Sequence, residues 1–99
     1  MDSKKIIWSE NAIKEFQDIL AFYADRNGNP NYSLKLIQLT DDMLNTVSKS
    51  ENIGRVTINR NTRVIPLKEF LLFYEIRQES IEILSYWDNR QSEEEKVFK

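Results

Sequence analysis

The hydrophobic pattern of this chain changes its period once, near Gly54, and this change limits the fold more than any other feature of the sequence. Before Gly54, apolar residues recur at every third or fourth position, which is typical of amphipathic helices. After Gly54, apolar and polar residues alternate, which is typical of strands. Because a run of helices is followed by a run of strands, the sequence predicts the α+β class.

The helical part divides in two at a short turn that reads Asn-Gly-Asn-Pro. Ser9 suits the N-cap of a first helix that we expect to end at about Arg26. Gly28 can adopt the left-handed conformation that ends a helix, and Pro30 suits the first position of a second helix that fades by Ser50. Two long helices joined by so short a turn are expected to lie antiparallel as a hairpin.

Five segments are predicted to be strands, one before the helices and four after them. They cover residues 4–8, 56–58, 63–67, 70–77 and 81–87, with a turn at residues 59–62. Pro66 limits its strand to an edge or a bend, whereas residues 70–77 begin with apolar side chains on both faces and are expected to be central. We expect one domain over residues 1–99, with an N-terminal strand and the helical hairpin on one face of a mainly antiparallel sheet of four to five strands. Its predicted core includes Phe73, Ile83 and Leu84.

Cysteine and histidine are both absent from the 99 residues. Their absence excludes disulfides, zinc fingers, Cys nucleophiles, Ser-His-Asp triads and His-based acid and base pairs. Any chemistry must use Lys, Arg, Tyr, Ser, Asp or Glu, and no cofactor or metal is expected. No stretch approaches the roughly 20 apolar residues that a membrane span needs, and a signal-peptide core is lacking. We therefore expect a cytoplasmic protein with no membrane partner.

The positive charges are gathered in one segment although the net charge of the chain is -2. Residues 55–68 contain four cations and no acid: Arg55, Arg60, Arg63 and Lys68. One interpretation is a strand pair that faces an anionic partner. The alternative is a solvated strand edge, in which Arg63 pairs with Glu75 or Glu82 of a neighbouring strand.

Several segments resemble, in order and spacing, the RelE/ParE superfamily of toxins from bacterial type II toxin-antitoxin modules. They are residues 6–12 (Ile-Ile-Trp-Ser-Glu-Asn-Ala), the helical hairpin, a Gly-led basic strand pair ending in Arg63, residues 71–76 (Leu-Leu-Phe-Tyr-Glu-Ile), and residues 81–91, which end in Asn-Arg-Gln. The resemblance covers nearly the whole chain. It implies a cytoplasmic bacterial toxin that a cognate antitoxin neutralises, with DNA gyrase as the target of ParE-like members and ribosome-bound mRNA as the target of RelE-like members.

One departure from the RelE pattern favours the ParE-like function and possible gyrase inhibition. RelE-like nucleases use Lys, Arg and Tyr, and one of their arginines would fall here on Leu71 or Leu72, which cannot neutralise a phosphate. The first alternative is a RelE-like mRNA endonuclease with the catalytic candidates Arg63, Lys68, Tyr86 and Arg90. The second is an inactive relative that acts only as a binding partner. Tyr86 has the further interpretation of a core aromatic residue.

The resemblance also implies how the antitoxin binds. Antitoxins of this superfamily wrap their toxins with an extended segment and a helix, which requires apolar grooves and exposed strand edges on the toxin. Phe22 falls off the main apolar face of the first helix and is a candidate contact. The candidate partner-binding residues are Arg55, Arg60, Arg63, Arg90 and Phe22.

Overall fold

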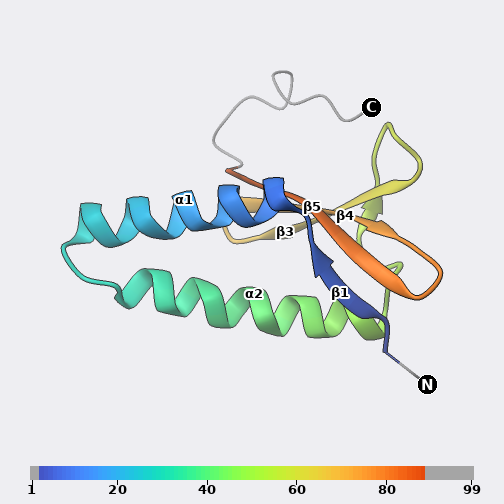
Figure 1. The fold of residues 1–99 in the computed structure, drawn as a ribbon, viewed down its shortest axis with the longest axis horizontal. Helices are drawn as coiled ribbons and strands as arrows, with labels where there is room; N and C mark the ends of the chain where they lie inside the picture. The colour runs from blue at the N-terminus through green and yellow to red at the C-terminus, as the bar shows by residue number, and fades with distance from the viewer. Residues whose placement is uncertain (1–2, 89–99) are drawn as a thin grey trace.

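The computed structural model describes residues 3–88, and these form two helices and five strands (Figure 1). In chain order they are β1 (Lys5–Trp8), α1 (Glu10–Asn27), α2 (Asn31–Lys49), β2 (Arg55–Val56), β3 (Thr62–Leu67), β4 (Phe70–Ile76) and β5 (Ser80–Asp88). The strands make one sheet in the order β1-β5-β4-β3-β2. Strand β1 runs parallel to β5, and the other neighbours are antiparallel. The predicted α+β class and the central position of residues 70–77 are confirmed.

Local capping explains where the helices begin and end. The Ser9 hydroxyl accepts a hydrogen bond from the Ala12 N–H at 3.0 Å, and Gly28 ends α1 with a φ of 71°. Pro30 was expected as the first residue of α2, but it precedes the helix and contributes no side-chain cap. The Asn29 side chain accepts from the Asn31 N–H at 3.0 Å instead, because an Asx oxygen can satisfy an N–H at a helix start that proline cannot.

Strand β2 is shorter than predicted. Of the strand expected at residues 56–58, only Val56 pairs with β3. The paired segment begins one residue earlier, at Arg55. The Thr57 hydroxyl lies 2.8 Å from the Asn59 carbonyl oxygen and 3.0 Å from that of Thr62, and these local bonds turn the chain out of the ladder. Because β2 is so short, Pro66 lies outside the part of β3 that pairs with β2. Its missing N–H therefore removes no hydrogen bond to β2.

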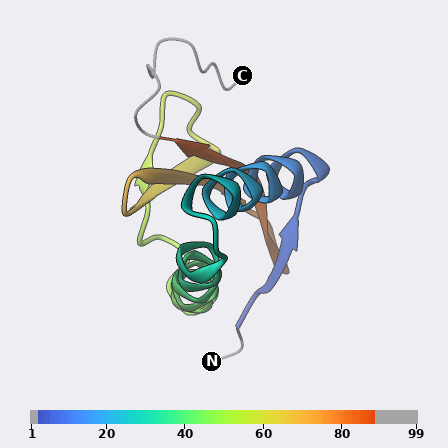
Figure 2. The same ribbon diagram turned by 90° about the vertical axis from the view of Figure 1, so that its left-hand side faces the viewer.

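The helical hairpin lies against one face of the sheet, and Figure 2 shows both helices nearly end-on beside it. Residues from both helices and from β3, β4 and β5 share the main core on this face. Its largest fully buried side chains include Tyr74, Tyr86, Phe70, Leu36, Leu72, Ile81 and Ile83. A smaller cluster on a second face of the sheet contains Val64, Leu71 and Phe73, with Leu84 and Trp87 packed against it. The predicted burial of Ile83 and Phe73 is confirmed.

A β-bulge at Leu84 changes which face the end of β5 presents. Phe73 of β4 is paired with Ser85, and the next residue, Tyr74, is paired with Ile83, so Leu84 has no counterpart in the register. Simple alternation along β5 would place the Tyr86 side chain on the same face of the sheet as Leu84 and on the opposite face from Ile83. Because the bulge inserts one residue, Tyr86 instead joins Ile83 in the main core. Leu84 is only partly buried, against the smaller cluster, so its predicted place among the buried core residues is wrong.

The first turns of α1 hold this bulge in place. The Ser9 hydroxyl and the Asn11 side-chain amide both donate to the Leu84 carbonyl oxygen, at 3.3 and 3.1 Å. One carboxylate oxygen of Glu15 accepts from the Ser85 hydroxyl at 2.6 Å and from the Tyr86 N–H at 3.2 Å. Backbone groups that the bulge removes from the ladder are therefore satisfied by α1.

We expect Glu15→Ala to lower the free energy of unfolding by about 2–3 kcal/mol, because it removes a charged acceptor from two part-buried donors. Gln17→Ala, at an exposed position of the same helix, should change it by less than about 0.5 kcal/mol. Urea denaturation of both variants measures the difference. Equal stabilities for the two variants would contradict the proposed support of the bulge.

Candidate functional site

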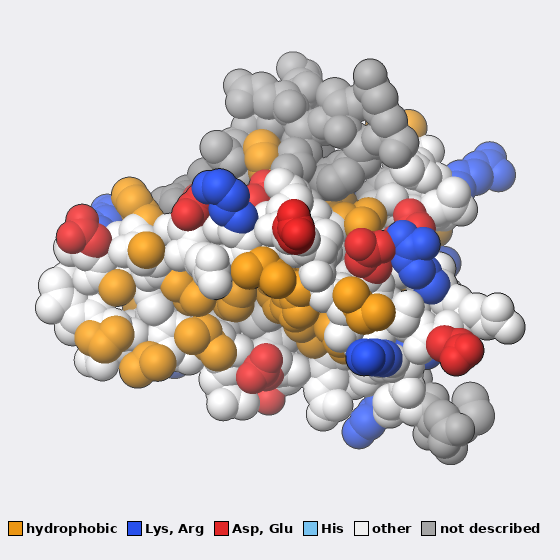
Figure 3. All heavy atoms as spheres, viewed as in Figure 1, with side chains coloured by type: hydrophobic (Ala, Val, Ile, Leu, Met, Phe, Trp, Pro, Cys, Tyr) orange, Lys and Arg blue, Asp and Glu red, His pale blue; other side chains and the backbone are white. Residues whose placement is uncertain are grey.

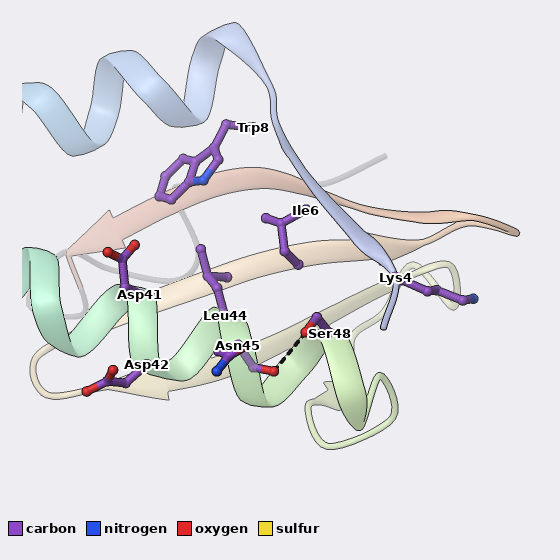
Figure 4. Close-up of a pocket in the computed structure, with 8 residues that line it drawn as sticks. All are labelled: Lys4, Ile6, Trp8, Asp41, Asp42, Leu44, Asn45 and Ser48. Carbon is purple, nitrogen blue, oxygen red and sulfur yellow. Dashed lines mark hydrogen bonds between the residues drawn. The ribbon is translucent and has the colours of Figure 1, made fainter. Parts of the chain in front are cut away.

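An open groove of about 450 Å³ lies between β1 and α2 (Figure 4). It is lined by Lys4, Ile6, Trp8, Asp41, Asp42, Leu44, Asn45 and Ser48. The side chains of Ile6, Trp8 and Leu44 project into the space between the two elements, while the Lys4 side chain points away from it (Figure 4). The Lys4 N–H donates to the Ser48 carbonyl oxygen at 3.1 Å and joins β1 to α2 at that end. The groove therefore has an apolar centre and charged groups at its margin.

Exposed apolar residues extend this groove along α2. Leu34 is 59% exposed and Ile37 is 37% exposed. Because residues three or four positions apart share a helix face, these two continue the face that carries Asp41 and Leu44. Figure 3 shows hydrophobic side chains along both helices and toward β1 on the same side of the molecule.

Aromatic stacking fixes the Trp8 wall of the groove. The ring of Trp8 stacks on Phe16 with centroids 5.4 Å apart, and Phe16 stacks on Tyr86 at 4.4 Å. The Tyr86 hydroxyl lies 2.8 Å from the Thr40 hydroxyl of α2. Burial raises the pKa of Tyr86 to about 12, so its hydroxyl stays protonated at neutral pH. Trp8 is thus held in place before any partner binds.

Arg63 binds backbone carbonyls of the loop after α2. Its guanidinium donates to the Gly54 oxygen at 2.6 Å and to the Asn52 oxygen at 3.3 Å. The alternative, an ion pair of Arg63 with Glu75 or Glu82, is wrong. Both of these carboxylates form ion pairs with Arg77 instead.

Tyr74 supports the same loop from β4. Its hydroxyl accepts from the Gly54 N–H at 2.9 Å and donates to the Glu51 carbonyl oxygen at 2.8 Å. Burial raises the pKa of Tyr74, against the smaller opposite effect of its hydrogen bond from Gly54. A Cβ at Gly54 would lie 2.6 Å from the Tyr74 oxygen, so this position requires glycine. Together Tyr74 and Arg63 fix the backbone that leads into β2.

Of the remaining cations of the basic segment, Lys68 lies apart from Arg55 and Arg60. Arg55 on β2 and Arg60 in the following turn are exposed. Arg60 and Arg63 share the lining of a hollow of about 410 Å³ with Asn61, Glu75, Ile76 and Arg77. Lys68 has a φ of 55° in the turn between β3 and β4. Lys68 follows Arg63 by five positions along the strand, which corresponds to roughly 17 Å.

Of the four catalytic candidates, the structure describes three, and it does not bring these three together. Tyr86 is 1% exposed, Lys68 and Arg63 lie at opposite ends of β3, and Arg90 lies outside the described residues. Phe22 is 54% exposed, as expected, and its ring meets Tyr23 edge-on at 5.1 Å. It lines a separate hollow of about 440 Å³ between α1 and the end of β5.

Sequence reasoning missed the groove between β1 and α2. Trp8 is partly buried at the edge of the core, and its position opposite Leu44 depends on the tertiary fold. Leu34 and Ile37 were the signal in the sequence that could have indicated the groove. The other apolar residues of this helix already suffice for a core, so these two are left for the surface.

Two further site types are not found in the described part of the chain. Among residues 3–88, no three or more His, Cys, Asp or Glu side chains are grouped so that they could hold a metal ion. Neither helix within that range has the length and apolar character needed to cross a membrane.

Comparisons with known proteins agree with this architecture. The family model of the ParE toxin of type II toxin-antitoxin system, parDE, matches residues 6–92. A solved structure described as the chromosomal ParDE TA system from P. aeruginosa has a similar chain, with a TM-score of 0.74 and 19% sequence identity. The alignment covers 87% of this chain and 96% of that chain, and no curated protein matches. The structural likeness confirms the RelE/ParE-like fold, and because the family match spans most of the sequence, the chain belongs to the ParE toxin family of type II toxin-antitoxin systems.

Proposed function

We propose that this ParE family member acts in the bacterial cytoplasm as a toxin that inhibits DNA gyrase, and that a cognate antitoxin neutralises it by filling the groove between β1 and α2. The observation that carries the proposal is the open groove, with Trp8 and Leu44 on its two walls and polar side chains around them. Leu34 and Ile37 extend the groove as exposed apolar surface that a partner can cover.

The shape and composition of the groove suit an amphipathic helix of the antitoxin. Such a helix binds by placing apolar residues at every third or fourth position into a hydrophobic groove. Leu34 and Ile37 offer a row of contacts along α2, and each fully buried side chain of this kind contributes about 1.5–3 kcal/mol. Asp41 and Asp42 at the margin supply negative charges that can fix the register of the partner.

The positions of the candidate catalytic residues argue against RNA cleavage, the alternative to gyrase inhibition. Stabilising a cleavage transition state requires cationic and proton-transferring groups around one phosphate. Leu71 and Leu72 are buried where the RelE pattern carries an arginine. The Arg63 guanidinium already binds two carbonyl oxygens, and the Tyr86 hydroxyl lies in the core. Arg63 and Tyr86 therefore stabilise the fold in this structure.

We expect the double variant Leu34→Ala, Ile37→Ala to weaken antitoxin binding by tenfold or more, because it removes two apolar contacts from the groove. Its thermal stability should stay close to that of the wild type, since both side chains are exposed. The matched control is Lys35→Ala, an exposed position between them, which should leave the Kd within about twofold. Calorimetric titration measures the three values, and an unchanged Kd for the double variant would remove the groove from the antitoxin interface.

We expect the purified toxin, freed of antitoxin, to inhibit DNA supercoiling by gyrase and to leave ribosome-bound mRNA intact. Both assays should be run on one preparation so that loss of folding affects them equally. Codon-specific mRNA cleavage would establish the RelE-like alternative and contradict the proposal. Inactivity in both assays, with intact antitoxin binding, would instead establish an inactive relative that acts only as a binding partner.

A further inference from the structure

The two edges of the sheet carry two different exposed surfaces. Strand order places β1 at one edge and β2 at the other. Figure 2 shows β1 on one side of the helical hairpin and the segment that contains β2 on the other side. The groove beside β1 is the proposed antitoxin site. The surface around β2 has no role in that proposal.

Exposed aliphatic side chains gather around β2. Ile53 is 50% exposed, Val56 is 48% exposed, and Ile58 is fully exposed at 101%. Single exposed apolar residues are ordinary on protein surfaces, but three within six residues form a patch. We call the surface formed by Ile53, Arg55, Val56, Ile58 and Arg60 the basic tip.

The charge of the basic tip has one sign. Residues 52–68 contain no acidic side chain. Arg63 binds the carbonyl oxygens of Asn52 and Gly54, so Arg55 and Arg60 are the charges that the tip itself presents to solvent. The tip therefore combines aliphatic side chains with two exposed guanidinium groups, in a chain whose net charge is -2.

The backbone that leads into the basic tip is fixed from inside the protein. Tyr74 bonds the Gly54 N–H, and Arg63 bonds the Gly54 carbonyl oxygen. On the other side of the tip, the Thr57 N–H donates to the Thr62 oxygen at 3.0 Å, and the Thr62 N–H donates to the Asn59 oxygen at 2.9 Å. A surface that is already ordered loses less conformational entropy when it binds.

We propose that the basic tip is the surface with which the toxin contacts its target protein, at an apolar pocket ringed by carboxylates. The proposal rests on the proposed function, because it assigns the target to a surface that the antitoxin leaves open. Aliphatic side chains favour a protein over a nucleic acid, since single-stranded nucleic acids are bound by aromatic side chains on which bases stack. Carboxylates on the target would complement the charges of Arg55 and Arg60. Ile58 is the side chain of the tip that enters the apolar pocket of the target.

The experiment compares one triple variant and one double variant with the wild-type toxin. The tip variant is Arg55→Glu, Ile58→Asp, Arg60→Glu, and the control is Arg26→Glu, Lys35→Glu, which reverses two exposed charges on the helices. Three readouts are measured for each protein: inhibition of supercoiling by gyrase, growth arrest after induced expression, and antitoxin Kd. The melting temperature shows that each variant is folded.

We expect the tip variant to need at least ten times the wild-type concentration for half-inhibition of gyrase and to lose growth arrest. Its antitoxin Kd should stay within about threefold, and the control should match the wild type in all readouts. Full growth arrest by the folded tip variant would overturn the proposal. Loss of antitoxin binding with gyrase inhibition retained would also overturn it, because the tip would then belong to the antitoxin interface.

The same experiment separates this proposal from the proposed function. If the wild-type toxin arrests growth without inhibiting gyrase, gyrase is the wrong target, and the growth readout still tests the tip. Binding of a single-stranded RNA oligonucleotide by the wild type, abolished in the tip variant, would overturn the choice of a protein partner.

Discussion

The β-bulge at Leu84 determines how the two layers of this protein meet. One extra residue in β5 turns Tyr86 toward the helices, where it stacks on Phe16 and bonds Thr40. Without the bulge, the same position would face away from the core. The polar side chains at the start of α1 stabilise the bulge by bonding the backbone that it exposes. The position of α1 on the sheet and the local geometry of β5 therefore depend on each other.

The groove follows from this arrangement. Trp8 ends β1, which lies parallel to β5, and stacks on the same Phe16 that packs on Tyr86. The tight turn at Gly28 then returns α2 beside α1, so that Leu44 faces Trp8 across open space. At the other edge of the sheet, Tyr74 and Arg63 fix the loop before β2. One buried framework thus supports two exposed surfaces at opposite edges.

The sequence predicted what local chemistry decides. The Ser9 cap, the left-handed Gly28 and the change of period near Gly54 gave both helices, the strand order along the chain and the fold class. The faces of the last strand do not follow from alternation in the sequence, because the bulge at Leu84 is supported by residues more than 70 positions earlier in the chain. The sequence presents Arg63 as a candidate ligand for an anion because a pattern of charged residues does not show which backbone carbonyls an arginine will bind in the fold. A groove formed by β1 and α2 likewise needed the tertiary structure.

The central claim is that the antitoxin covers the groove beside β1 and leaves the basic tip at the opposite edge exposed. Amide hydrogen exchange of the toxin, alone and with its cognate antitoxin, tests this claim most directly. The antitoxin should slow exchange in β1 and in α2 and leave the rates of residues 53–61 unchanged. Slower exchange at residues 53–61, with β1 and α2 unaffected, would contradict it.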